Sequence, residues 1–350
     1  MRAALRLAAV TATLFALASG GVVAQPAPMS APMTERITAP SEPPRVDMAR
    51  LDLGLRARAL ADGVYVIEGA NADFSPANGC NIINTGFIVT DAGVVVVNTG
   101  PSRRYGEQQR ALIERTTGQP VVQVVHLNLH PDYFLGNQAY ADLPRRATEA
   151  TRAGMAREAA AYETNLYRLC GDWMKGTQAL LPDAGPATSL DAAASAGVLR
   201  IGGRELLLQE LRGHTDSDLV LIDRRSGVAF IGGLAFADRI PTTPHARIDD
   251  WLASLTTLAA TLKAADARVI VPSHGPVRAD TSALFQTRDY LRWLDHRLRT
   301  SARNGLELAE VLKLPVPAPY KDWAAVQTEY LRNVVHLFPG HEQAVLGAAR

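Results

Sequence analysis

The sequence predicts a mixed α/β domain in which helices cover two sheets. Hydrophobic residues make up 47% of the chain and charged residues 20%, which is ordinary for a globular protein and excludes disorder for most of its length. Short β-branched runs, typical of strands, are interspersed with longer runs of helical periodicity. The two kinds of run do not alternate strictly, so a simple doubly wound sheet is not expected. One domain of roughly 275 residues fits this pattern better.

The first half of the predicted domain opens with a strand, a polar loop and a hairpin. The hairpin is indicated by two β-branched runs joined by Asp91, Ala92 and Gly93. A helix, a strand and a helical insertion follow. In order, the elements are expected at residues 63–67, 86–90, 94–97, 103–115, 120–129 and 147–175.

The second half begins with four short strands and ends in helices. After the strands, a helix leads to one further strand, and two helices occupy the last 70 or so residues. In order, we expect strands at residues 198–201, 205–208, 219–222 and 228–231, a helix at 247–264, a strand at 268–271, and helices at 284–301 and 323–336.

The N-terminal segment predicts export. Residues 1–24 show the order of a secretory signal peptide, with two arginines, an apolar stretch at 7–17 and small residues before Gln25. The apolar stretch is too short for a permanent membrane anchor, so we expect no stable membrane insertion. The proline-rich residues 25–50 are expected to form a disordered tether. Residues 51–280 would form the main domain, and residues 281–350 C-terminal helices packed on it.

The charge balance argues against a nucleic-acid partner. Lysine and arginine total 36 against 35 acidic residues, a formal net charge of +1. A nucleic-acid-binding protein needs a basic excess to neutralise phosphates, and none is present. We therefore expect a small-molecule ligand.

Two cysteines occur, Cys80 and Cys170. In an oxidising compartment they are candidates for a disulfide, although sequence alone does not supply the geometry. A reactive thiolate or a cysteine metal ligand is the alternative. Neither cysteine lies beside a histidine, and no CxxC motif is present.

Three histidines stand out because each lies at the end of a predicted strand, beside glycine or proline. His130 precedes Pro131, His214 follows Gly213, and His274 precedes Gly275. Loops at strand ends commonly carry functional polar groups. Together with Asp132, these imidazoles form the ligand set that zinc prefers. We therefore predict a metal site made by His130, Asp132, His214 and His274.

The other histidines lack such neighbours. His126 shares a face of its strand with residues 128 and 130, so it could approach the site. The remaining four also lack them: His245, His296, His336 and His341. For His296 and His336, which lie on helical patterns, we expect surface or packing roles.

The order of these motifs resembles the metallo-β-lactamase superfamily over residues 55–340. The resemblance rests on Gly86-Phe87-Ile88-Val89, Val97-Asn98-Thr99-Gly100, His130-Pro131-Asp132, Gly136-Asn137, Gly213-His214-Thr215, Gly232-Gly233 and Ser273-His274-Gly275-Pro276. The Asn-Gly-Cys-Asn segment at 78–81, the Phe-Leu-Gly-Asn loop at 134–137, the helical tail and the signal peptide are similar to the periplasmic quinoprotein relay system zinc metallohydrolases. The resemblance implies an αββα four-layer sandwich with a C-terminal helical extension.

Measured against the superfamily's two-metal pattern, this chain has several substitutions. Asn128 stands in place of the first histidine, Tyr133 in place of the histidine after Asp132, and Gly233 in place of the bridging aspartate. Asn98 replaces the aspartate of the usual Asp-Thr-Gly turn. The resemblance therefore implies one zinc ion per chain at most, held first by Asp132 and His274 and completed by His214 or His130.

The expected function is a periplasmic, single-zinc hydrolase of an acyl or thioester compound. By analogy, Asp132 or a spare histidine would accept a proton, Asn128 would donate a hydrogen bond to an oxyanion, and Tyr133 would be a weak oxygen ligand. A periplasmic quinoprotein dehydrogenase or cytochrome would be the partner. The alternative is a metal-poor, non-catalytic binding protein that serves the same pathway.

Overall fold

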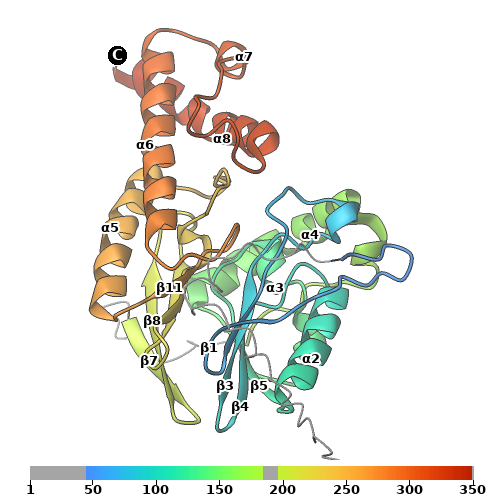
Figure 1. Cartoon of the computed structure of the whole chain (residues 1–350). Helices are drawn as coiled ribbons and strands as arrows, with labels where there is room; N and C mark the ends of the chain where they lie inside the picture. The colour runs from blue at the N-terminus through green and yellow to red at the C-terminus, as the bar shows by residue number, and fades with distance from the viewer. Residues whose placement is uncertain (1–44, 184–195, 349–350) are drawn as a thin grey trace, which may run out of the picture.

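The computed structural model describes residues 45–183 and 196–348 (Figure 1). The predicted signal peptide and residues 25–44 of the predicted tether lie outside these ranges. Residues 47–52 form a turn in which Asp47 and Asp52 exchange two backbone hydrogen bonds of 2.7 and 3.0 Å. Within the described ranges, every helix is too short or too polar to span a bilayer.

Two mixed sheets form the centre of the molecule. The first has the strand order β1-β2-β3-β4-β5-β6 and the second the order β11-β10-β9-β8-β7. The strands of the first are β1 (Arg58–Ala61), β2 (Val64–Ile67), β3 (Thr85–Thr90), β4 (Gly93–Val97), β5 (Val121–Val125) and β6 (Arg145–Arg146). Those of the second are β7 (Ala196–Ile201), β8 (Arg204–Leu211), β9 (Asp218–Asp223), β10 (Val228–Phe230) and β11 (Val269–Val271).

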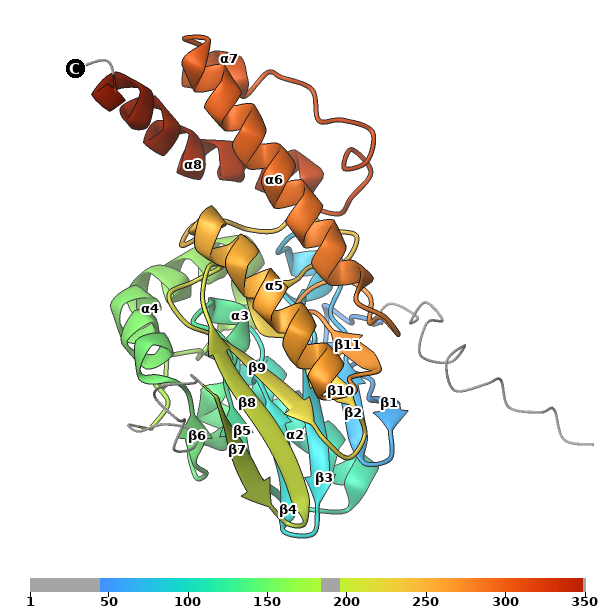
Figure 2. The same cartoon turned by 90° about the vertical axis from the view of Figure 1, so that its left-hand side faces the viewer.

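Helices cover the outer faces of both sheets, as Figures 1 and 2 show. Helices α2 and α4 lie on the side of the first sheet, and α5 and α6 on the side of the second. This arrangement confirms the predicted αββα sandwich with a C-terminal helical extension. The helices are α2 (Arg103–Thr117), α3 (Pro131–Phe134), α4 (Glu149–Cys170), α5 (Ile248–Ala264), α6 (Ser282–Arg303), α7 (Leu308–Val311) and α8 (Val326–Ala348).

The alternation of side chains along the strands explains why the chain forms three apolar layers. In β4, Val95 and Val97 point into the core between the sheets, whereas Val94 and Val96 pack under the outer helices. In β9, Leu221 belongs to the central core and Ile222 to the layer beneath the C-terminal helices. Strands buried on both faces therefore read as unbroken apolar runs.

The C-terminal helices share one apolar cluster with the second sheet and α5. Tyr290 of α6 accepts a hydrogen bond of 2.9 Å from Asn333 of α8, and both side chains are buried. Phe338 of α8 is fully buried in the same cluster. These contacts hold the N-terminal part of α8 over one edge of the two sheets (Figure 1).

That edge carries the loops with the predicted site residues. The loop after β5 enters α3, the loop after β11 contains His274, and the connection from β8 to β9 contains His214. A short 3-10 turn after β10, η4 (Gly232–Leu234), lies at the same edge. The sandwich thus brings four segments far apart in the chain to one place.

Candidate active site

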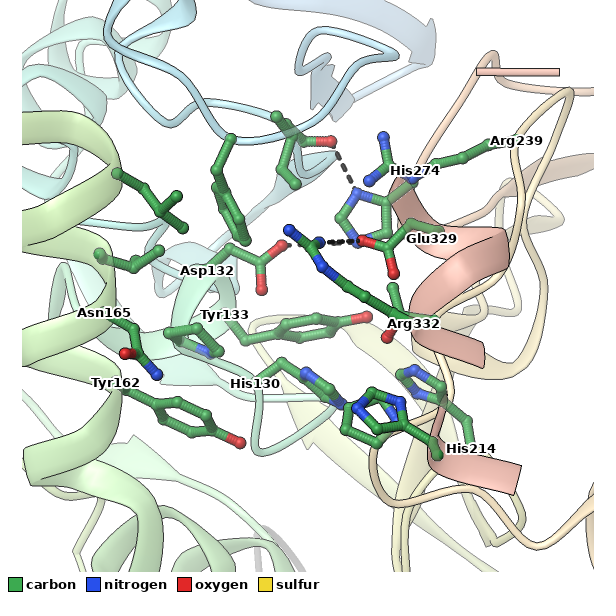
Figure 3. Close-up of a pocket in the computed structure, with 18 of the residues that line it drawn as sticks. His130, Asp132, Tyr133, Tyr162, Asn165, His214, Arg239, His274, Glu329 and Arg332 are labelled. Atoms are coloured by element: carbon green, nitrogen blue, oxygen red, sulfur yellow. Dashed lines mark hydrogen bonds and ion pairs between the residues drawn. The ribbon is translucent and has the colours of Figure 1, made fainter. Parts of the chain in front are cut away.

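The loop edge encloses a cavity of about 400 Å³ between α4 on one side and α8 on the other (Figure 3). All four predicted metal ligands line it: His130, Asp132, His214 and His274. Tyr133 lines it as well, whereas Asn128 does not. The further lining residues are Phe74, Ile82, Pro131, Tyr162, Asn165, Leu166, Arg168, Leu169, Arg239, Thr242, Pro244, Glu329, Arg332 and His336.

Asp132 and His274 form the closest pair of predicted ligands. Asp132 Oδ2 lies 3.4 Å from His274 Nε2, and both side chains are almost fully buried. His274 Nδ1 lies 2.8 Å from the carbonyl oxygen of Ile82. Because a carbonyl only accepts, Nδ1 carries the proton and Nε2 keeps its lone pair. The backbone thus orients the imidazole in the way that second-shell groups orient metal-ligating histidines.

Burial and local charge alter the pKa values of this pair. Burial raises the pKa of Asp132 to about 7, while the positive charge of Arg239 acts in the opposite direction. Burial lowers the pKa of His274 well below its usual value, and Arg239 lowers it further. At neutral pH the imidazole is therefore neutral and the carboxyl is close to its titration midpoint.

His130 and His214 lie together on another wall of the cavity. Their rings stack with centroids 4.8 Å apart and planes inclined by 15°. The lone pair of an imidazole nitrogen lies in the ring plane, so two nearly parallel rings do not point at one common ion. Both Nε2 atoms are nevertheless buried and lack a hydrogen-bond partner. Burial, followed by the neighbouring histidines, lowers the pKa of His130.

Asn128 supports His214 and His130 from behind the cavity. Its Nδ2 donates to Asp218 Oδ1 at 2.5 Å, and its Oδ1 accepts from the backbone N–H of His130 at 3.0 Å. Asp218 Oδ1 also lies 3.3 Å from His214 Nδ1. The side chain of Asn128 is fully buried and holds these loops in place. Its assignment as an oxyanion donor stays a prediction.

Tyr133 places its phenol ring between the two pairs of candidate ligands (Figure 3). The hydroxyl is buried beside Ser273, whose side chain interacts with it, and neither oxygen makes a hydrogen bond of regular geometry. Burial, and then the charge of Asp132, raise the pKa of Tyr133 well above its usual value. The phenol therefore stays protonated and can donate a hydrogen bond into the cavity.

Gly233 is the residue that the resemblance aligns with the aspartate of the two-metal pattern. A Cβ atom at this position would lie 2.0 Å from His214 Nδ1. His214 thus occupies the space that a coordinating side chain at residue 233 would need. The arrangement leaves no room for a side chain at residue 233 while His214 keeps this position.

The candidate ligands are of the chemical kind that zinc prefers, but not all of them point at one common position. Asp132 Oδ2 and the Nε2 atoms of His130 and His214 lie beside one cavity, and each is buried without a hydrogen-bond partner. Buried polar groups are normally hydrogen-bonded, so such a set indicates a ligand, an ion or water. Within the described ranges, however, no three His, Cys, Asp or Glu side chains converge as a ready-made metal site. Of the candidate ligands, Asp132 Oδ2 and His274 Nε2 lie 3.4 Å apart, a separation that suits two ligands of one ion.

Several residues at the cavity were not predicted from the sequence. His336 lines it, although we expected a packing role for this residue. His245, which we did not place at the site, lies beside His130 with ring centroids 5.4 Å apart. Conversely, His126 is fully buried outside the lining, with Nδ1 3.1 Å from the carbonyl of Tyr133. Glu329, Arg332 and His336 have the spacing i, i+3, i+7, which places them on one face of a helix. This spacing was the only feature of the sequence that could have grouped them.

The two cysteines form a disulfide next to the cavity. Cys80 and Cys170 are joined, with Cα atoms 5.9 Å apart, so both cysteines of the chain are oxidised. Cys170 is the last residue of α4, which supplies Leu166 and Leu169 to the cavity wall. Cys80 lies two residues before Ile82, the hydrogen-bond partner of His274. The disulfide therefore ties the wall to the loop that orients His274.

The family profile for the metallo-β-lactamase superfamily matches residues 78–274, more than half of the chain. The chain belongs to the metallo-β-lactamase superfamily. This is the fold of metal-dependent hydrolases, and members of the superfamily usually bind zinc. No curated protein matches the chain significantly.

Solved metallo-β-lactamases share the fold at low sequence identity. An enzyme from Pontibacter korlensis is 24% identical, with a TM-score of 0.53 over 68% of this chain and 99% of that one. One from Hirschia baltica is 18% identical, with a TM-score of 0.52 and coverages of 68% and 97%. A mono-zinc form from Pseudomonas aeruginosa is 17% identical, with a TM-score of 0.53 and coverages of 68% and 95%.

Proposed function

We propose that this protein is a single-zinc hydrolase of an acyl or thioester compound. The observation that carries the proposal is that three potential metal-ligating atoms are buried beside one cavity without a hydrogen-bond partner. They are Asp132 Oδ2 and the Nε2 atoms of His130 and His214. Asp132 and His274 would hold the metal, and His214 or His130 would complete its ligands. When bound, zinc supplies a Lewis acid for the substrate carbonyl and a water whose pKa is lowered to about 7.

The chain's own groups perform the remaining steps. The hydrogen bond from His274 Nδ1 to Ile82 fixes the imidazole so that Nε2 faces Asp132. Whichever of His130 and His214 is not a ligand would accept a proton from the attacking water at Nε2 and return it to the leaving thiolate or alkoxide as the acyl bond breaks. The protonated phenol of Tyr133, which lies between the two pairs, donates a hydrogen bond to the developing oxyanion.

The cellular setting belongs to the same proposal. The signal-peptide pattern at 1–24 and the disulfide between Cys80 and Cys170 both suit an oxidising periplasm. Export with cleavage before Gln25 would be seen as a mature N-terminus at that residue by mass spectrometry of the periplasmic protein. The resemblance to the quinoprotein relay hydrolases supports a quinoprotein dehydrogenase or cytochrome as the pathway partner.

Thioester hydrolysis tests the activity directly. A panel of acyl thioesters is offered to the zinc-loaded protein, and released thiol is read with a thiol-reactive dye. The chain has two cysteines, both in the disulfide, so it adds no thiol background. We expect turnover that a chelator removes and that falls at least about a hundredfold in Asp132→Asn.

An exposed aspartate provides the matched control. Asp142 pairs with Arg110 at the surface, 2.6 Å away, so Asp142→Asn should retain turnover. Equal activity in Asp132→Asn and the wild type would refute the assigned role of Asp132.

A second candidate function is a metal-poor binding protein that serves the same pathway. The absence of a preassembled three-donor group within the described residues favours it. This candidate predicts ligand binding in the cavity without metal uptake or turnover.

A further inference from the structure

A short segment before β3 supplies the carbonyl group that orients His274. The carbonyl oxygen of Ile82 lies 2.8 Å from His274 Nδ1, and Figure 3 draws a dashed line at His274 for this contact. Ile82 also lines the cavity. Because an imidazole ring can rotate about its side-chain bonds, the hydrogen bond at Nδ1 decides which way Nε2 faces. The position of Ile82 therefore sets the direction of one candidate ligand.

Asn84 holds the backbone on either side of His274. Its backbone N–H donates to the carbonyl of Ser273 at 2.8 Å. Its Nδ2 donates to the carbonyls of Pro272 and Gly275 at 3.0 and 2.7 Å. Asn84 immediately precedes β3, so these bonds attach the loop to the first sheet. They fix the backbone of the loop and leave the direction of the ring to another contact.

The disulfide restrains the chain two residues before Ile82. Cys80 has a φ of 58°, in the left-handed region that residues other than glycine seldom adopt. Asn81 accepts one backbone hydrogen bond, from Ala70 at 2.8 Å, and its buried side-chain amide has no hydrogen-bond partner among the described residues. The covalent bond at Cys80 is therefore the strongest restraint on this side of Ile82. Without it, Cys80 can leave its strained conformation and carry the Ile82 carbonyl away from His274.

The other end of the disulfide is anchored in the cavity wall. Cys170 is the last residue of α4 and is buried with Cys80 in the apolar cluster beneath the outer helices. The next element, η3 (Gly171–Met174), contains Trp173, whose Nε1 donates to the carbonyl of Pro76 at 2.8 Å. This hydrogen bond ties the end of α4 to the same loop that carries Cys80. The disulfide is thus fixed at a packed helix end and can act as a firm restraint on Ile82.

We propose that the Cys80–Cys170 disulfide is a positioning element of the site, which sets the orientation of the His274 ring through the carbonyl of Ile82. The site is therefore complete only in the oxidised protein. The inference rests on the proposed function only where zinc is named as the ligand of His274, because the hydrogen bond that orients the ring needs no metal. Removal of a group that orients a metal-ligating histidine typically weakens metal binding by about 10- to 100-fold.

The test variant is Cys80→Ala/Cys170→Ala. Alanine is chosen because both cysteines lie in an apolar cluster, where serine would bury two hydroxyl groups. The matched control is Leu258→Ala in α5, a fully buried residue that does not line the cavity. A leucine-to-alanine change in a core destabilises a protein about as much as the loss of a disulfide does. The two variants therefore differ in the restraint on Ile82 and not in overall stability.

Ring N–H signals of the metal-free protein test the proposal by NMR. The full mature chain is labelled with ¹⁵N-histidine in a chelating buffer that contains sucrose, which favours the folded state of every variant. His126 is the internal reference, because its Nδ1 lies 3.1 Å from the carbonyl of Tyr133 and its side chain is fully buried. The two signals are assigned by their loss in His274→Ala and His126→Gln. Without the disulfide, we expect the His274 N–H to exchange with water at least about tenfold faster and the His126 N–H to be unchanged.

Three outcomes would overturn the proposal. The first is equal exchange of the His274 N–H with and without the disulfide. The second is loss of both ring signals in the disulfide-free variant, since the bond would then stabilise the whole fold and not position one ring. The third is faster exchange of His274 in Leu258→Ala, which would show that the ring follows overall stability. We expect Leu258→Ala to keep both signals.

Zinc affinity separates this proposal from the hydrolase proposal. Competition with a chelating indicator should show at least about tenfold weaker zinc binding in Cys80→Ala/Cys170→Ala, and wild-type affinity in Leu258→Ala. If the wild type takes up no zinc, the hydrolase proposal fails and the ring signals still decide the positioning role. If the wild type binds zinc and the disulfide-free variant binds it equally tightly, the positioning role fails and the hydrolase proposal stands.

Discussion

His214 fills the space beside Gly233, because a Cβ atom on that glycine would lie 2.0 Å from His214 Nδ1. The imidazole is held there by Asp218 and is packed against Trp251, with ring centroids 5.0 Å apart. The position of His214 and the lack of a side chain at residue 233 are therefore linked by sterics. If Gly233 does stand in place of a bridging aspartate, as the resemblance implies, the same contact accounts for the proposed single-metal site.

Restoring the aspartate should not restore a two-metal centre. In Gly233→Asp the new side chain must displace His214, which we expect to cost roughly 1–3 kcal/mol of unfolding free energy. Gly340 on α8 has open space around its position for a Cβ, so Gly340→Asp is the matched control. Urea unfolding measures the cost, and metal analysis of the same samples gives the stoichiometry. Two equivalents of zinc in Gly233→Asp would contradict this account.

The disulfide should contribute strongly to stability. It closes a segment with a sequence separation of 90 residues, so replacing both cysteines by serine should cost on the order of 4 kcal/mol. Urea unfolding of the wild type with and without reductant measures the same loss. The Cys80→Ser/Cys170→Ser protein is the control and should not respond to reductant. If reduction leaves the wild-type midpoint unchanged, the bond does not stabilise the fold.

In metal-free protein, the contribution of Asp132 to the free energy of unfolding should fall as the pH rises. The pKa of Asp132 is raised from 3.8 to about 7 by burial, so the folded state binds the proton more tightly than the unfolded state does. Its stabilising contribution is complete below about pH 4 and is lost as the pH rises through about 7, with a slope approaching 1.4 kcal/mol per unit.

The comparison with Asp132→Asn isolates this contribution. Unfolding free energies of both proteins, measured in chelator between about pH 5 and 8, should show the wild type falling relative to the variant up to about pH 7. Beyond that pH the difference should level off. His130 and His274 are present in both proteins, so their opposite dependence largely cancels. A difference that stays constant with pH would show that Asp132 titrates normally.

The sandwich could be predicted because its strands are buried on one or both faces. Such strands appear in the sequence as alternating or continuous apolar runs. The β3–β4 hairpin, α2, α4, α5 and α6 lie within about five residues of their predicted ranges, and the three histidine loops lie at strand ends as predicted. The last helix, expected at 323–336, instead runs from Val326 to Ala348. The helices and strands that were not predicted are short: β1, α3, β6 and α7 have two to four residues each, too few to show a period. Such elements depend on tertiary contacts for their stability.

The site was predictable only where it uses the family's motif positions. His130, Asp132, His214 and His274 follow strands and come together because strand ends meet at one edge. Arg239 follows no recognisable motif, and nothing local marks it as a buried cation. Whether a given helix lies over a particular cavity depends on packing among distant segments, so the residues that α8 contributes could not be assigned to the site beforehand.

Zinc content tests the central claim most directly. The protein is purified from the periplasm without added zinc, and bound metal is measured for the wild type, for His274→Ala and for the exposed control His296→Ala. We expect about one equivalent in the wild type and the control, and less than about a tenth of an equivalent in His274→Ala. Less than about a tenth of an equivalent in the wild type, with no thermal stabilisation by added zinc, would contradict the account. An unchanged content in His274→Ala would show that the metal lies elsewhere.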